Sequence, residues 1–243
     1  MPQEVGATEW LATLSVGKVV FGAFVLTVLR LILVPLKAPV VRPILELIES
    51  LLIAGVLVFL IVRPFFLQAF FIPSESMEPT LMGHTAGDRH SDTVHDHIFV
   101  WKLGYRLGQP KPGDIIVFRA ERKADRENGH RDENVLIKRL IAVGPDTIEV
   151  RRDEQGQVRV YRNGKPLNEP YIREPMRDVR LSTFDTTYAT DGPLKLKPGE
   201  LFVMGDNRNN SNDSRFWGPL PRNRVLGKAI CIFWPLSRIR ILK

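Results

Sequence analysis

Two serines in a short stretch bounded by prolines could supply a nucleophile and a hydrogen-bond donor beside it. They are Ser74 and Ser76, which lie between Pro73 and Pro79. In an extended backbone, residues two apart point to the same side, so the two hydroxyl groups would face one site. One hydroxyl could attack a carbonyl carbon while the other, with a backbone N–H, stabilised the oxyanion that forms. A surface loop capped by prolines is the alternative interpretation.

Such a serine needs a base, and Lys138 lies in an apolar segment that could make it one. Residues 135–143 carry two charged side chains, Lys138 and Arg139, and are otherwise aliphatic. An amine accepts a proton only when it is neutral, which requires a pKa well below the usual ~10.4. Burial would lower the pKa of Lys138, with the like charge of Arg139 as a smaller contribution. An edge strand whose lysine reaches water is the alternative.

A third, polar segment could hold such a site in place. Residues 205–215 follow an apolar run, contain no aliphatic side chain and are rich in Asn, Asp, Ser and Arg. These side chains suit a fixed hydrogen-bond network, although an ordinary solvent-exposed turn would have the same composition.

Short strands must position these three segments. After residue 73, apolar runs alternate with turn sequences such as Pro-Gly-Asp and Asn-Gly, and no long helical periodicity occurs. We therefore predict a mainly antiparallel β fold, in which residues 147–200 form a β-rich subdomain insert. A strand at residues 65–72 leads into the serine segment. The other predicted strands are residues 98–102, 114–119, 135–143, 147–152, 158–162, 201–205 and 227–234.

The first 72 residues have a different character from the remaining 73–243. They hold nine of the 61 charged side chains. Residues 19–36 and 44–62 are apolar and each about long enough to cross ~30 Å of hydrocarbon, which predicts a membrane anchor of one or two transmembrane helices. Their connection carries Lys37 and Arg42, and cations favour the cytoplasmic side, so the rest of the chain would lie outside the cytoplasm. Buried helices of a soluble protein are the alternative.

Charge and composition exclude several other functions. The net charge of +7 is not gathered in a basic stripe with interleaved aromatics, which argues against nucleic-acid binding, while a basic surface suits anionic lipid. The single cysteine, Cys231, permits neither a disulfide within the chain nor a thiolate metal cluster. Four histidines among aspartates in residues 84–97 match no closed metal site, so we expect a solvated loop, no metal and no cofactor.

Together these segments resemble the bacterial type I signal peptidases, or leader peptidases, which use a Ser/Lys dyad. The resemblance extends from about Glu46 to Lys243. Two departures are visible: Asn209 stands where the family usually has Asp, and the turn at Gly144-Pro145-Asp146 differs from the usual Gly-x-Pro-Gly-Asp. The matching segments are residues 74–81, 113–118, 138–139, 163–171, 205–215 and 227–235.

The resemblance implies a role for each matching residue. Ser76 would be the nucleophile and Lys138 the general base. Ser74 would donate to the oxyanion beside the Ser76 N–H, and Ser211 would hydrogen-bond and orient Lys138. Four residues would support the polar loop, the last two as an ion pair: Asp206, Arg208, Asp213 and Arg215.

It also implies a fold and a function. The fold would be a barrel-like antiparallel β catalytic domain behind the membrane anchor. The chain would be a membrane-bound serine endopeptidase that cleaves signal peptides from secreted and exported precursors, outside a bacterial plasma (inner) membrane, with precursors and membrane lipid as partners. Self-cleaving repressors have a similar Ser/Lys β fold, but they lack anchors and carry a DNA-binding domain that is absent here. A non-catalytic, membrane-tethered β module that binds extended peptides or anionic lipid is the second alternative.

Overall fold

A computed structural model describes residues 16–36, 41–83, 94–120, 135–177 and 188–242. The chain divides into two compact units, Met1–Ala69 and Phe70–Lys243. The expected boundary after residue 72 therefore lies three residues beyond the observed one, and residues 147–200 belong to the larger unit.

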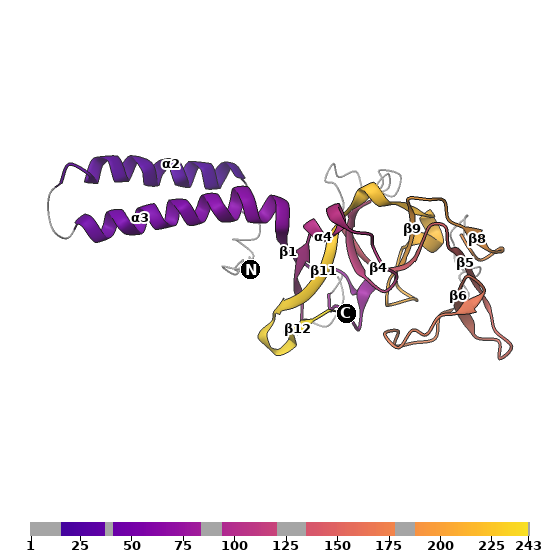
Figure 1. Cartoon of the computed structure of the whole chain (residues 1–243). Helices are drawn as coiled ribbons and strands as arrows, with labels where there is room; N and C mark the ends of the chain where they lie inside the picture. The colour runs from indigo at the N-terminus through magenta and orange to yellow at the C-terminus, as the bar shows by residue number, and fades with distance from the viewer. Residues whose placement is uncertain (1–15, 37–40, 84–93, 121–134, 178–187, 243) are drawn as a thin grey trace, which may run out of the picture. The chain divides into compact units, whose positions relative to one another are not determined.

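Two α-helices lie in the described part of the smaller unit, at the two apolar stretches of the sequence. They are α2 (Val16–Leu33) and α3 (Val41–Val56), which lie side by side in Figure 1. Arg30 of α2 pairs with Glu49 of α3, with 3.1 Å between Nη2 and Oε2. Arg30 therefore lies in an apolar helix and has an acidic partner on the neighbouring helix, which the sequence alone did not indicate.

The helices differ from the predicted membrane spans in length and regularity. The second one ends as an α-helix at Val56 and continues as a π-helix, η1 (Leu57–Phe66), before strand β1 (Leu67–Phe71) begins. Within the described residues, no helix combines the length and the apolar character that a membrane crossing needs. The helical conformation is as expected, but the two spans at residues 19–36 and 44–62 are not confirmed.

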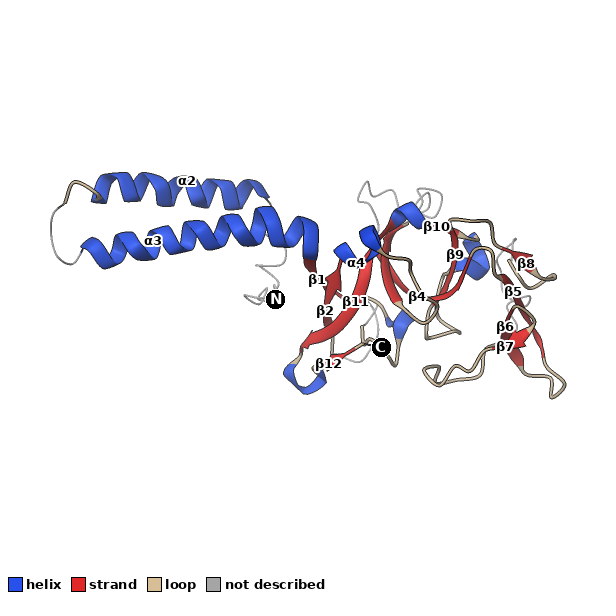
Figure 2. Cartoon of the chain, viewed as in Figure 1, coloured by secondary structure: helices blue, strands red, loops and turns tan. Residues whose placement is uncertain are grey.

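The larger unit is mainly antiparallel β, as predicted (Figure 2). Its main sheet has the strand order β1-β2-β11-β3-β4-β9-β10, with β12 paired to β11, and a second sheet has the order β7-β6-β5-β8. The strands after β1 are β2 (His97–Trp101), β3 (Ile115–Arg119), β4 (Val135–Val143), β5 (Thr147–Arg152), β6 (Val158–Arg162), β7 (Lys165–Pro166), β8 (Leu194–Lys195), β9 (Glu200–Met204), β10 (Leu220–Pro221), β11 (Val225–Trp234) and β12 (Arg240–Ile241). The short helices are η2 (Glu75–Met77), α4 (Leu103–Leu107), α5 (Ser214–Trp217), η4 (Arg222–Arg224) and η5 (Leu236–Arg238).

The predicted strands lie within two residues of observed ones at each end, because their apolar side chains fill three buried clusters. One cluster joins the two sheets: Ile141 and Phe202 of the main sheet pack with Ile148 and Val160 of the second. Burial of these aliphatic and aromatic side chains holds the second sheet against strands β4 and β9. The site residues described below lie within β4, in the loop that follows β9 and in the segment after β1.

The turn after β4 is tight, and it is one of the two places where the sequence departs from the family pattern. The Gly144 N–H donates to Glu200 O at 2.8 Å, and the Asp146 N–H donates to Val143 O at 2.9 Å. A Cβ atom added to Gly144 would lie 1.9 Å from the Lys197 carbonyl oxygen. Glycine is therefore required here by the close approach of two backbone segments.

We predict that Gly144→Ala lowers the free energy of unfolding by about 3 kcal/mol, because the new methyl group meets backbone that cannot move away cheaply. Denaturant unfolding followed by tryptophan fluorescence would measure the loss. Gly156→Ala is the control: its methyl group enters open space, and only the positive φ of 77° opposes it, at a cost of about 1 kcal/mol. Equal losses in the two variants would show that the contact with Lys197 is unimportant.

Candidate active site

The two serines meet, but not through the extended backbone that the sequence suggested. Ser74 is extended, with φ of −131° and ψ of 156°, and it begins the 3-10 helix that contains Ser76. The two Oγ atoms are 3.3 Å apart. Met77 and Leu81 are fully buried in the same core cluster, and their packing holds this helical turn in place. The expectation that the hydroxyl groups share one site is met by a helical turn rather than by strand alternation.

Lys138 reaches the second of these serines. Its Nζ donates a hydrogen bond to Ser76 Oγ at 2.5 Å, although 62 residues separate the two in the chain. Strand β4 carries the lysine, where Lys138 pairs with Ile116 of β3. The side chains are almost removed from solvent, with 4% of Lys138 and 8% of Ser76 exposed. A serine hydroxyl and a buried amine are thus in direct contact.

Burial lowers the pKa of Lys138 from 10.5 to about 8. The negative charges of Asp213 and Asp206 raise the pKa, and the positive charge of Arg215 lowers it. The sequence had suggested Arg139 as the like charge, but the structure gives this role to Arg215. A large fraction of Lys138 is therefore neutral at mildly alkaline pH, as a general base must be.

Arg139 has a different role, as the partner of Asp206. Its Nε and Nη2 atoms donate to the two carboxylate oxygens at 2.8 and 2.7 Å, and both side chains are buried. Strand β4 pairs with β9 so that Arg139 lies opposite Met204, two residues before Asp206. The ion pair therefore ties the start of the polar loop to the residue next to Lys138.

The predicted ion pair between Asp213 and Arg215 is present, and both side chains are fully buried. Arg215 Nε and Nη2 donate to the carboxylate at 2.8 and 2.9 Å, and the Gly205 N–H donates to it at 3.0 Å. Burial alone would raise the pKa of Asp213, but Arg215 and these hydrogen bonds hold it below its usual value. The Asp213 carboxylate therefore stays charged. By accepting from the Gly205 N–H, it joins the two ends of the polar loop, residues 205–215.

Arg208 connects the polar loop to Glu169, which the sequence did not indicate as part of the site. It is buried, donates to both oxygens of Glu169 at 2.8 and 2.5 Å, and donates to Gly205 O at 3.0 Å. Tyr171 OH also donates to Glu169 at 2.8 Å, and the Arg139 guanidinium lies 4.0 Å from the centre of its ring. Residues 163–171 match the family pattern, but the match alone does not indicate that Glu169 binds Arg208.

Ser211 does not form the predicted hydrogen bond with Lys138. Its Oγ is buried and has no hydrogen-bond partner. A Cβ atom on Gly205 would lie 2.3 Å from this Oγ and 2.4 Å from Ser76 O. Ser211 therefore packs against Gly205, and the missing Cβ there lets Ser211 and the backbone of Ser76 approach each other.

The unusual Asn209 has partners of its own. Its Oδ1 accepts from the Arg177 N–H at 2.9 Å, and its Nδ2 donates to Pro175 O at 3.1 Å. These contacts attach the loop to residues 175–177 by amide hydrogen bonds, which need no charge at this position.

The histidine segment falls partly outside the described residues, which include His95 and His97 but not His84 or His90. The His95 ring forms a 2.9 Å hydrogen bond with Ile72 O and contacts the Phe71 ring, with 4.7 Å between ring centres and 31° between the ring planes. In the ranges that the structure describes, no group of three or more His, Cys, Asp or Glu side chains could hold a metal ion.

We predict that the Lys138 amine titrates with a midpoint near pH 8, because burial disfavours its charged form. The titration can be followed by NMR from the ¹³Cε signal of lysine in the detergent-solubilised protein, with Lys138→Met identifying the signal by its loss. A midpoint near the ordinary value of 10.5 would contradict the geometry described above.

Comparison with known proteins identifies the family. The model of the family "Signal peptidase, peptidase S26" matches residues 44–234. Signal peptidase I of Mycobacterium tuberculosis H37Rv is 36% identical over 238 residues, covering 84% of this chain and 78% of that protein. Signal peptidase I of Leptolyngbya laminosa is 37% identical over 197 residues, covering 81% of this chain and 83% of that protein.

A solved structure is also similar in sequence: signal peptidase I of Enterococcus faecalis V583 is 28% identical and covers 50% of this chain and 97% of that one, with a TM-score of 0.35. The assignment rests on the family match, which spans most of the chain, and on the curated relatives above 30% identity. The chain belongs to the signal peptidase family, peptidase S26.

Proposed function

We propose that this protein is a serine endopeptidase that cleaves signal peptides from secreted and exported precursor proteins, with Ser76 as nucleophile and Lys138 as general base. One observation carries the assignment of roles: a buried amine whose pKa is lowered to about 8 lies 2.5 Å from a serine hydroxyl. A module that only bound peptides would not need this contact, and burying a lysine costs free energy.

In the proposed reaction, neutral Lys138 accepts the Ser76 proton as Oγ attacks the carbonyl carbon at the cleavage site. The oxyanion accepts hydrogen bonds from Ser74 Oγ and from the Ser76 N–H. Protonated Lys138 then gives its proton to the departing amine, which leaves an acyl group on Ser76. A water molecule, deprotonated by Lys138, hydrolyses this ester and restores the free enzyme.

The proposed setting is the extracytoplasmic face of a bacterial plasma membrane, with the N-terminal unit in contact with lipid. Supporting this, α2 and α3 expose large apolar side chains that water does not favour, including Phe21 and Leu31 at 68% exposed and Ile53 at 62%. The precursors would supply their signal peptides from the same membrane.

We predict that Ser76→Ala and Lys138→Met each lower kcat for a model precursor by at least about 10⁴-fold, because each removes half of the reacting pair. Ser74→Ala should lower kcat by about 10²–10³-fold, the usual loss for one oxyanion donor. Cleavage by detergent-solubilised protein, followed by gel electrophoresis, gives the rates. Lys195→Met, at an exposed position in β8, serves as the control and should retain activity; substantial cleavage by either dyad variant would reject the assignment.

The pH dependence of cleavage has a definite sign. Lys138 acts as base only when neutral, so kcat/KM should rise as pH increases through about 8 and fall about tenfold per pH unit well below that value. Initial rates in constant ionic strength buffers would measure this profile. A rate that stays flat from pH 8 down to pH 6 would mean that the lysine is not the base.

A further inference from the structure

The segment that carries the nucleophile, residues 72–82, is closed where it begins and ends by contacts outside the proposed reaction. The Ile72 N–H donates to Asp96 O at 3.0 Å, and the Asp96 N–H donates to Met82 O at 2.9 Å. A Cβ atom added to Gly83 would lie 2.7 Å from Ile72 O, so the chain leaving the segment lies directly against its beginning. The nucleophile therefore lies in a loop whose two ends meet.

The side chain of Asp96 adds to this closure and is fully buried. Its Oδ2 accepts from the Met82 N–H at 2.8 Å. Arg238, the last residue of η5, donates to both carboxylate oxygens, from Nε at 2.7 Å and from Nη2 at 3.0 Å. Three N–H groups thus point at the two oxygens of one carboxylate. An asparagine would turn its own NH₂ group toward at least one of these donors, so the contacts require an aspartate.

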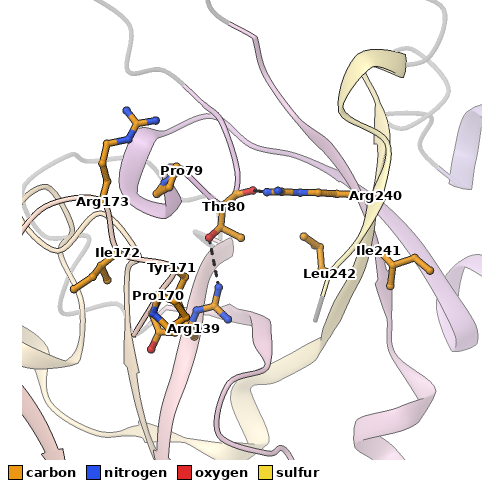
Figure 3. Close-up of a pocket in the computed structure, with 10 residues that line it drawn as sticks. All are labelled: Pro79, Thr80, Arg139, Pro170, Tyr171, Ile172, Arg173, Arg240, Ile241 and Leu242. Atoms are coloured by element: carbon orange, nitrogen blue, oxygen red, sulfur yellow. Dashed lines mark hydrogen bonds between the residues drawn. The ribbon is translucent and has the colours of Figure 1, made fainter. Parts of the chain in front are cut away.

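The last residues of the chain also bind the nucleophile segment directly. Arg240 of β12 donates to Thr80 O, and Arg139 Nη2 donates to Thr80 Oγ1 at 3.5 Å, as Figure 3 shows. Leu242 is buried in the core cluster that contains Met77. The turn and strand at the end of the chain therefore hold the segment both through the carboxylate and by their own contacts.

We infer that Asp96 and Arg238 are positioning residues for the nucleophile. Their ion pair keeps the two ends of the segment together and thereby places Ser76 Oγ within hydrogen-bond reach of Lys138. They act through the backbone of the segment, and a shift of about 1 Å in a reacting group can lower a rate by about 10²-fold. This inference rests on the proposed function, because it names residues that support the same reacting pair.

The test removes the arginine and keeps the carboxylate. Arg238→Gln should slow acylation of Ser76 by a peptide ester about tenfold and leave KM for a model precursor unchanged, because the nucleophile moves while the substrate contacts remain. Acylation is measured in a single turnover with the full chain in detergent and in excess over the ester, so that a smaller folded fraction does not lower the rate constant. Arg238→Lys, which can still donate to the carboxylate, should recover most of the rate.

Arg159→Gln is the matched control, because it breaks a similar arrangement in the second sheet. Arg159 pairs with Asp153 at 2.7 Å, and this carboxylate also accepts from the backbone N–H groups of Gln155 and Gln157. The control should acylate as the wild type does. An equal loss of rate in Arg159→Gln and Arg238→Gln would overturn the inference, since the loss of any such ion pair would then have the same effect.

A second measurement needs no substrate. Hydrogen–deuterium exchange at the Ile72 and Met82 amides should be about tenfold faster in Arg238→Gln than in the wild type, and unchanged in Arg159→Gln, because the closing contacts protect these N–H groups. Unchanged exchange in Arg238→Gln would show that the ion pair does not close the segment. Faster exchange with acylation at the wild-type rate would overturn the positioning role. A wild type that forms no acyl group would count against the proposed function, while the exchange would still decide whether the pair closes the segment.

Discussion

A buried amine that no carboxylate touches is the constraint on which the rest of the site depends. Among the described residues Lys138 forms no ion pair, although Asp206 and Asp213 are near enough to raise its pKa. Each of these carboxylates is bound through both oxygens by an arginine, Arg139 or Arg215. Burial is the largest influence on Lys138, and the positive charge of Arg215 acts in the same direction, so the pKa falls to about 8. An unpaired carboxylate at Nζ would keep the amine protonated.

The ion pairs can do this because the sheet brings their segments together. Pairing of β4 with β9 places Lys138 and Arg139 beside the strand from which the polar loop begins. The loop then returns to the nucleophile, where the Asn207 N–H donates to Ser76 O at 3.2 Å. Gly205 leaves room for this approach. One strand register thus sets the position of the base, its electrostatic surroundings and the backbone of the nucleophile.

The sequence predicted the features that depend on local pattern. Alternating apolar runs located the strands, and the matching segments located Ser76, Lys138 and the Asp213–Arg215 pair. Contacts between residues that are far apart in the chain were either not predicted or predicted wrongly. The partnership of Arg139 with Asp206 and the contribution of Glu169 join residues far apart in the chain, and no periodicity reveals such pairs. The expected bond from Ser211 to Lys138 is absent, because Ser211 packs on Gly205 instead. The apolar stretches form helices, but the change from an α-helix to a π-helix after Val56 is a feature of backbone geometry that hydropathy does not describe.

The central claim is that Lys138 activates Ser76 and not its neighbour Ser74, whose hydroxyl oxygen is only 3.3 Å away. The most direct test is to mix the protein with a peptide ester, quench in acid within milliseconds, and locate the acyl group by mass spectrometry of the digested chain. The account predicts the acyl group on Ser76 alone, and none in Lys138→Met. An acyl group on Ser74, or equal acylation of Ser76 without the lysine, would contradict it.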